Sequence, residues 1–125
     1  MYSKDDYIDE LIVRVKTAVY VDRKVVSAGG WKPVERRCHD NAVSFCKLDV
    51  YFKRVYGFLF NDMSELGFVA FIFHSVVECS NGSFIDITPT TAKNEYPFIV
   101  SNIPDEAYEE LMYEYENEGQ IEVQL

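Results

Sequence analysis

The segment GFVAFIFHSVVEC, residues 67–79, constrains the fold more than any other part of the chain. β-Branched and aromatic residues fill this segment, and residues of these types are favoured in strands. The triplet SNG that follows is typical of a hairpin turn. The segment SFIDITP, 83–89, then returns until Pro89, which cannot donate a hydrogen bond to a sheet. We therefore expect an antiparallel hairpin over these two segments.

Helical patterns occur on both sides of the hairpin. Ser3 and Asp6 resemble a capping box at the N-terminus, Cys38 opens a second helical pattern, and a third runs from Pro104 to Gly119. The expected helices cover about 4–17, 38–53 and 103–119, and the expected strands cover about 18–27, 55–60, 67–79, 83–89 and 120–125. The first of these strands could instead extend the first helix. This order predicts the α+β class, with a small, mainly antiparallel sheet packed against helices.

The composition is that of one globular domain. With 125 residues, 48% apolar and 15% aromatic, the chain 1–125 can bury a single core. No apolar run approaches the roughly 20 residues that cross a bilayer, and the acidic N-terminus lacks the features of a signal peptide. We therefore expect a cytoplasmic protein with reduced thiols, without membrane association and without a cofactor. The odd number of cysteines, 3, also fits poorly with a disulfide framework.

The net charge of −9 comes entirely from the C-terminal part of the chain. Residues 94–125 contain acidic residues and no Lys or Arg, whereas the charges before them cancel. No basic patch of the kind that binds nucleic acid is evident, so we expect no nucleic-acid partner. The acidic end is either a solvated helix face or a docking surface for a basic protein partner.

Cys38 opens a predicted helix directly after Arg36 and Arg37, in the segment ERRCHDNAVSFC. A thiol becomes a strong nucleophile when it ionises, and a helix N-terminus and nearby cations lower its pKa. The free N–H groups of the helix start can also receive an oxyanion. Cys38 is therefore a candidate nucleophile, although a small buried thiol is the alternative. Cys46, at a core spacing in the same helix, is expected to be such a buried thiol.

Two histidines are candidates for the base that would activate this thiol. His74 interrupts the apolar run FIFHSVV. It is either a core histidine with a satisfied hydrogen bond or, if it lies close to Cys38, a general base whose ordinary pKa is near neutrality. His39 adjoins Cys38, but neighbouring side chains on a helix diverge by about 100°, so His39 is expected to be the poorer partner.

The position of Asp86 relative to His74 depends on the hairpin turn. With a two-residue turn, the two side chains would lie on opposite faces. With a three-residue turn at 80–82 and its glycine in the left-handed region, Val76 faces Asp86, and His74 lies diagonal to Asp86 on the same face, about 7–8 Å away by backbone. A triad with Cys38 therefore requires the three-residue turn. Asp86 could instead cap a turn at the strand end.

This order of residues resembles the core of papain-like cysteine hydrolases. A cysteine at a helix start, a histidine on a strand and a polar residue on the next strand occur in that order over about residues 31–90. The spacing is most similar to the NlpC-like and transglutaminase-like branches. The resemblance implies a papain-like fold with Cys38 as the nucleophile, His74 as the base and Asp86 as the residue that orients the histidine. It also implies a thiol hydrolase or acyltransferase acting on an amide, isopeptide or related acyl bond, with a protein or peptide among the possible substrates.

Trp31 and Asn41 are the candidates for binding substrate in the cleft around such a triad. Each residue also has a structural alternative. Trp31 could be a core anchor, and Asn41 could be a hydrogen-bonding residue in the first turn of the helix.

A binding module without catalytic activity is the alternative function. A small acidic protein could be an inhibitor, an immunity protein or a phage decoy. Its contact surface would be the charged last helix, since aromatic residues favour interfaces. The aromatic and apolar residues of that surface would be Tyr108, Met112, Tyr113 and Tyr115.

A metal site is disfavoured by the spacing of the possible ligands. The candidates would be Cys38, His39, His74 and Cys79, and they form no CxxC or HxxxH pattern. Cys79 also falls on the opposite strand face from His74. We therefore expect no bound metal.

Overall fold

The computed structural model describes residues 3–90 and 95–125, which form an α+β fold, as the sequence predicts. The helices are α1 (Lys4–Arg14), α2 (Cys38–Cys46) and α3 (Asp105–Glu114), with the 3₁₀ turns η1 (Val15–Thr17) and η2 (Ser64–Leu66). The strands are β1 (Asp22–Arg23), β2 (Lys53–Met63), β3 (Phe68–Glu78), β4 (Phe84–Asp86), β5 (Phe98–Val100) and β6 (Gln120–Gln124).

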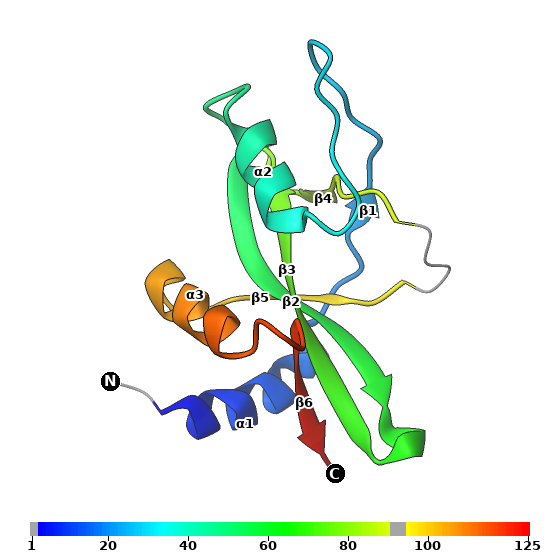
Figure 1. The fold of residues 1–125 in the computed structure, drawn as a ribbon, viewed down its shortest axis with the longest axis vertical. Coiled ribbons are helices and arrows are strands. Elements are labelled where there is room, and N and C mark those ends of the chain that lie inside the picture. The colour runs from blue at the N-terminus through cyan, green and yellow to red at the C-terminus, as the bar shows by residue number, and fades with distance from the viewer. Residues whose placement is uncertain (1–2, 91–94) are drawn as a thin grey trace.

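A long hairpin of β2 and β3 forms the centre of the sheet (Figure 1). The two strands pair along their whole length, from Lys53 opposite Glu78 to Met63 opposite Phe68. β5 extends the sheet beside β2, and β4 and β6 both pair with β3. β1 runs parallel to β4, because α2 and the β2–β3 hairpin lie between them and return the chain in the same direction. The sheet is therefore mixed: the pairing of β1 with β4 is parallel, and the other strand pairings are antiparallel, as expected for a mainly antiparallel sheet.

The turn between β3 and β4 has three residues, as the triad hypothesis requires. Val77 lies opposite Ile85, which is the register of a three-residue turn. Gly82 has a φ of 83°, a conformation that glycine adopts at little cost because it has no Cβ. In this register Asp86 lies on the same face of the hairpin as His74.

One edge of β3 has a short break in its strand pairing. β6 pairs with the first half of β3, and the N–H of Phe73 then donates to the carbonyl of Gly119. β4 begins to pair only at Val77. His74 and Ser75 therefore lie at the break, and α2 packs beside them, with its first turn bonded to the Ser75 hydroxyl.

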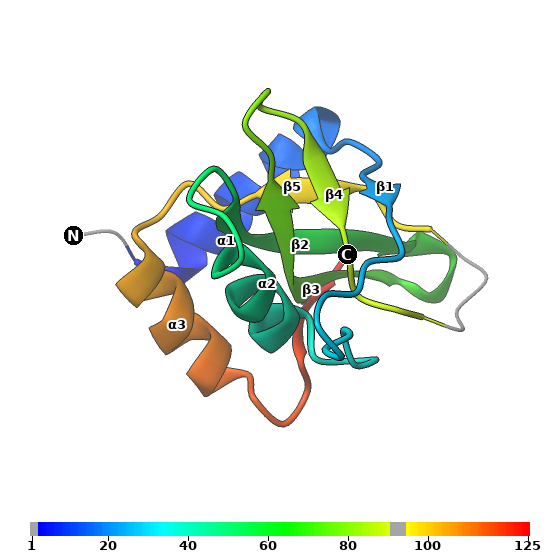
Figure 2. The ribbon, with the colours of Figure 1, turned by 90° about the horizontal axis from the view of Figure 1, so that it is seen from above.

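Two hydrophobic clusters hold the helices on the sheet. The larger joins α1 and α3 to β2, β3, β5 and β6, and its fully buried side chains include Tyr7, Leu11, Phe58, Phe71, Ile99, Tyr108 and Ile121. The smaller joins α2 to β3 and the segment after β4 through Ala42, Val77 and Ile87. Figure 2, which looks onto the end of the molecule that carries α2, shows the helices grouped around the β2–β3 hairpin.

The first helix and the final strand agree with the sequence prediction. The Ser3 hydroxyl accepts the N–H of Asp6 at the start of α1, and η1 continues the helical path to Thr17. β6 begins directly after Gly119, which has a φ of 69°. Segment 18–27 contains the short strand β1 rather than a continuation of α1.

The predicted end of the second helix is wrong. α2 ends at Cys46, not at about residue 53. The Asp49 carboxylate accepts the N–H of Tyr51 and so forms a local turn, as aspartate side chains often do. Lys53 already belongs to β2, where it pairs with Glu78. Strand pairing and the turn therefore override the apolar spacing that suggested a longer helix.

The C-terminal part of the chain also departs from the prediction at three points. The strand β5 was not expected, and its three residues pair with β2. α3 ends at Glu114, and turns rather than helix continue to Gly119. Tyr108, which the alternative function would place on a contact surface, has 0% exposure and belongs to the core. The Tyr108 hydroxyl forms hydrogen bonds with backbone groups of His74 and Gly57 inside the sheet, which explains why the side chain points inward.

Candidate active site

Cys38 is the first residue of α2, and its half-buried thiol faces a cleft. Arg37 is the N-cap residue, and its side chain makes no capping bond to the first N–H groups of the helix. Arg36 has a φ of 66° and is, within 3–90 and 95–125, the only residue other than glycine with a positive φ. Such backbone is strained for an L-residue and is often found at functional sites. The left-handed bend at Arg36 sets the direction in which the chain enters α2.

Asn41 fixes the loop that leads to α2. Its buried side chain accepts the N–H of Val34 and donates both to the carbonyl of Val34 and to the hydroxyl of Thr88. These three bonds tie the loop, the helix and the segment after β4 together. Asn41 therefore makes the hydrogen bonds expected of a structural residue in the first turn of the helix.

Trp31 also has the contacts of a structural residue. Its backbone pairs with Ala28, and its side chain packs against the smaller hydrophobic cluster. Among the residues that the structure describes, neither Trp31 nor Asn41 lines the cleft at Cys38. Their assignment as substrate-binding residues therefore gains no support from their positions.

His74 lies on β3 at the break in the strand edge. Its N–H donates to the hydroxyl of Tyr108 at 3.2 Å, and this hydroxyl donates to the carbonyl of Gly57, opposite His74 in β2, at 2.7 Å. A Cβ at position 57 would clash with the ring of Phe98. Glycine therefore lets Phe98 pack edge-on against the imidazole, with ring centroids 6.3 Å apart. These contacts fix both the backbone and the ring of His74.

Asp86 holds the His74 ring through a buried hydrogen bond. Oδ2 of Asp86 lies 2.7 Å from Nε2 of His74, and the two side chains are only 6% and 12% exposed. Oδ1 of Asp86 accepts the N–H of Thr88 at 3.1 Å, which fixes the carboxylate in turn. The three-residue turn thus brings together the two residues that the sequence paired.

Cys38 and His74 have pKa values shifted in opposite directions. Burial raises the pKa of the Cys38 thiol, but hydrogen bonds with His39 and His74 and their charges outweigh it and lower the pKa to about 6. Burial lowers the pKa of His74, but the hydrogen bonds and charges of Asp86 and Cys38 outweigh it and raise the pKa to about 9. Between these two values a thiolate beside an imidazolium is the favoured pair.

His39 lies beside the same thiol, although helix geometry predicted that it would be a poorer partner for Cys38 than His74. Its Nδ1 lies 2.5 Å from the Ser75 hydroxyl, and its ring packs edge-on against Tyr56 and Tyr108. Ser75 was not predicted from the sequence, although the polar pair HS within the apolar run of β3 is a signal for it. Adjacent strand residues point to opposite faces, so α2 at the strand edge meets both His74 and Ser75.

The cleft around these residues has a volume of about 900 Å³. Apolar side chains of β2, β3 and α3 form part of its wall, among them Leu59, Phe73 and Met112. Arg23 and Arg36 supply positive charge, and Glu116 and Glu118, in the turns after α3, supply negative charge. The cleft therefore offers apolar surface and both signs of charge beside the thiol.

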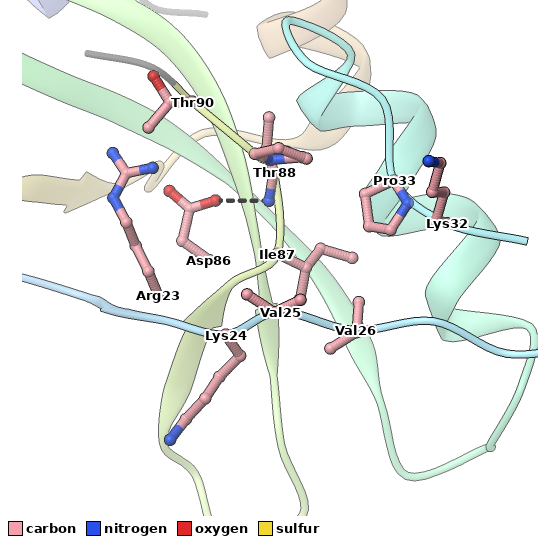
Figure 3. Close-up of a pocket in the computed structure, with 11 residues that line it drawn as sticks. Arg23, Lys24, Val25, Val26, Lys32, Pro33, Asp86, Ile87, Thr88 and Thr90 are labelled. Carbon is pink, nitrogen blue, oxygen red and sulfur yellow. Dashed lines mark hydrogen bonds between the residues drawn. The ribbon is translucent and has the colours of Figure 1, made fainter.

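Asp86 also lines a second cavity, with a volume of about 350 Å³ (Figure 3). Val25, Val26 and Ile87 contribute apolar side chains to its lining, and the Lys24 side chain points away from these residues in Figure 3. The two cavities share residues around Thr88, so the segment after β4 separates them.

Within 3–90 and 95–125, no group of three or more His, Cys, Asp and Glu side chains is arranged to hold a metal ion. No helix in the same ranges is long and apolar enough to span a bilayer.

Cys46 and Cys79 are free, half-buried thiols, and burial raises the pKa of Cys46.

No protein-family model, curated protein or solved structure matches the chain.

Proposed function

We propose that the protein is a papain-like thiol hydrolase or acyltransferase that acts on an amide, isopeptide or related acyl bond. The nucleophile would be Cys38, the base His74 and the orienting residue Asp86. One observation carries the proposal: a thiol at a helix start lines the same cleft as an imidazole that a buried carboxylate holds at 2.7 Å. These three groups supply the nucleophile, base and orienting acid of a catalytic triad.

In the resting site, the proton of the thiol resides on His74. The pKa of about 6 for Cys38 and of about 9 for His74 support this ion pair at neutral pH. The thiolate attacks the carbonyl carbon, a C–S bond forms, and the π electrons of the carbonyl move to its oxygen. The N–H groups at the start of α2, which Arg37 does not cap, stabilise this oxyanion.

The tetrahedral intermediate then collapses to an acyl-thioester. The bond to the leaving group breaks, and the imidazolium of His74 gives its proton to that group. Water, or an acceptor amine in an acyltransferase, next gives a proton to His74 and attacks the thioester. The C–S bond breaks, and the thiolate and imidazolium are restored. Asp86 stabilises the imidazolium whenever His74 carries the proton, and it does not take this proton itself.

The cleft supports a substrate larger than a simple acyl group. Its volume of about 900 Å³ lies within the range of small-molecule sites, which is roughly 300–1,000 Å³. Arg36 and Glu118 both line the cleft, and their charges would contact polar groups of an extended substrate. A peptide or protein segment that carries an amide or acyl bond has this mixed chemistry.

The test is acylation of Cys38 by p-nitrophenyl acetate, with the acetylated residue identified by mass spectrometry. We expect a rapid release of p-nitrophenolate and acetyl-thioester on Cys38. Cys38→Ala should abolish both, and His74→Ala should slow acylation by about 10²-fold or more at pH 7. Cys46→Ala is the matched control, because this thiol also lies in α2 but has a raised pKa, and it should react like wild type.

Two results would overturn the proposal. The first is acetylation spread over all three cysteines at similar rates. The second is an unchanged burst in a correctly folded Cys38→Ala protein. Either result would show that the thiol at the start of α2 is not an activated nucleophile.

Exposure of Tyr113 favours a second candidate, the acidic binding module. The Tyr113 side chain is 73% exposed on α3, and exposed glutamates lie on both sides of it in the sequence. This face would bind a basic protein, and the affinity would fall as salt screens the charges. The candidate gains weight if a partner is found whose binding is lost in Tyr113→Ala and retained in Cys38→Ala.

A further inference from the structure

His39 is the second imidazole at the Cys38 thiol, and the triad leaves it without a role. The ring is held firmly for a residue at the wall of a cleft. Nδ1 is bonded to the buried Ser75 hydroxyl at 2.5 Å, and ring centroids lie 5.6 Å from Tyr56 and 6.3 Å from Tyr108. One hydrogen bond and two aromatic contacts therefore fix the direction of the remaining nitrogen, Nε2.

Cys38 is the group that this nitrogen can meet. His39 and Cys38 line the same cleft, and because Nδ1 is occupied by Ser75, Nε2 is left for the sulfur. Burial raises the pKa of the thiol, and the hydrogen bond with His39 is the largest single effect that acts against burial, ahead of the hydrogen bond with His74. The thiol therefore has two imidazole partners, one from its own helix and one from β3.

The two imidazoles have partners of different charge. His74 faces the carboxylate of Asp86, which favours a proton on the ring, whereas His39 faces the neutral hydroxyl of Ser75. Because this hydroxyl occupies Nδ1, the N–H at Nε2 is the hydrogen-bond donor that His39 can offer to the sulfur. Such a donor can bond to a thiolate without exchanging a proton, which leaves proton transfer to His74.

We propose that His39 is a second catalytic histidine, which donates a hydrogen bond from Nε2 to the sulfur of Cys38 while the thiol is ionised, with Ser75 as its positioning residue. This inference rests on the proposed function, because it gives the proposed nucleophile a second support. During attack, the negative charge moves from sulfur to the carbonyl oxygen. The bond from His39 therefore weakens as the C–S bond forms, and no proton leaves His39.

A matched pair of substitutions separates the two ends of the ring. Asn at position 39 can place a polar atom near Nδ1 and keep the bond to Ser75, but it reaches no further. Gln at position 39 can place its amide N–H₂ near Nε2. The readout is the rate of Cys38 alkylation by iodoacetamide against pH, measured by peptide mass spectrometry. Urea unfolding of each variant checks that the fold is intact.

We expect His39→Asn to raise the midpoint of the Cys38 alkylation profile by about one pH unit, a roughly tenfold loss of thiolate at a given pH below the midpoint. His39→Gln should recover most of this loss. Ser75→Ala should raise the midpoint by a smaller amount in the wild-type background and have no further effect in His39→Asn. The last comparison distinguishes positioning through His39 from a direct effect of Ser75 on the thiol.

An unchanged midpoint in folded His39→Asn would overturn the inference, and so would equal shifts in His39→Asn and His39→Gln. His74→Ala, measured in parallel, tests the proposed function separately. If His74→Ala shifts the midpoint and His39→Asn does not, the triad stands and only the role of His39 fails. If Cys38 alkylates like an ordinary thiol in the wild-type protein, both proposals fail together.

Discussion

His74 and Asp86 face each other across a three-residue turn, with Nε2 and Oδ2 only 2.7 Å apart. Both side chains are buried, so little water screens their interaction. Asp86 is also held by the N–H of Thr88. The N–H of Thr88 thus helps to orient the carboxylate toward the imidazole. The positive charge on the imidazole is stabilised by this oriented carboxylate.

Asp86→Asn should lower the pKa of His74 from about 9. The substitution keeps the size of the side chain and an oxygen for the N–H of Thr88, but it removes the charge that favours the imidazolium. NMR titration of the His74 ring protons in the wild-type and variant proteins measures the change. A His74 titration curve that is the same in both proteins would contradict the role given to Asp86.

The Cys38 thiol and the His74 imidazole should have opposite effects on how the free energy of unfolding changes with pH. The pKa of His74 is raised from 6.5, so its contribution is complete below pH 6.5 and is lost as the pH rises through about 9. The pKa of Cys38 is lowered from 9.0, so its contribution is complete above pH 9 and is lost as the pH falls through about 6. In the wild-type protein the two slopes cancel between about pH 6.5 and 9.

Cys38→Ser removes one of these slopes and leaves the other. We therefore expect its free energy of unfolding to fall with rising pH from 6.5, by about 1 kcal/mol per pH unit at first, while that of the wild type stays level. Urea unfolding at a series of pH values measures both curves. Cys46→Ser is the control and should follow the wild type in this window. Parallel curves for Cys38→Ser and wild type would show that the two groups are not paired in the folded protein.

Arg36→Gly should stabilise the fold. The left-handed backbone at Arg36, with φ of 66°, costs an L-residue roughly 1–2 kcal/mol, and glycine adopts it freely. Glycine also has more freedom in the unfolded chain, so we expect a net gain of about 0.5–1 kcal/mol in the free energy of unfolding. Arg37→Gly is the matched control, because its φ of −117° suits any residue, and it should not stabilise. A destabilised Arg36→Gly protein would mean that the arginine side chain makes contacts that outweigh the strain.

Hairpin geometry explains why the relation of His74 to Asp86 could be predicted from the sequence. Strand side chains alternate, and the length of a turn sets which residues face each other, so both rules act over a short stretch of chain. Cys38 at the start of α2 could be predicted for the same reason, because its signals lie in adjacent residues. The α+β class also followed from the order of the local patterns.

The parts that could not be predicted depend on contacts between distant segments. His39 lines the cleft beside Cys38, and Ser75, 36 residues further on, holds its ring; no local pattern encodes that contact. The end of α2 depends on the turn at Asp49 and on the pairing of β2. β5 has only three residues, and its pairing with β2 stabilises it more than its own sequence does.

Tyr108→Phe should destabilise the protein and weaken the support of His74. The buried hydroxyl accepts the N–H of His74 and donates to the carbonyl of Gly57, so its removal leaves two buried backbone groups without this partner. We expect a loss of about 1–3 kcal/mol in the free energy of unfolding, measured in urea. Tyr113→Phe, at a side chain that is 73% exposed, is the control and should change stability by less than about 0.5 kcal/mol. Equal effects of the two substitutions would mean that the sheet does not depend on the hydroxyl of Tyr108, and that the position of His74 is fixed by strand pairing alone.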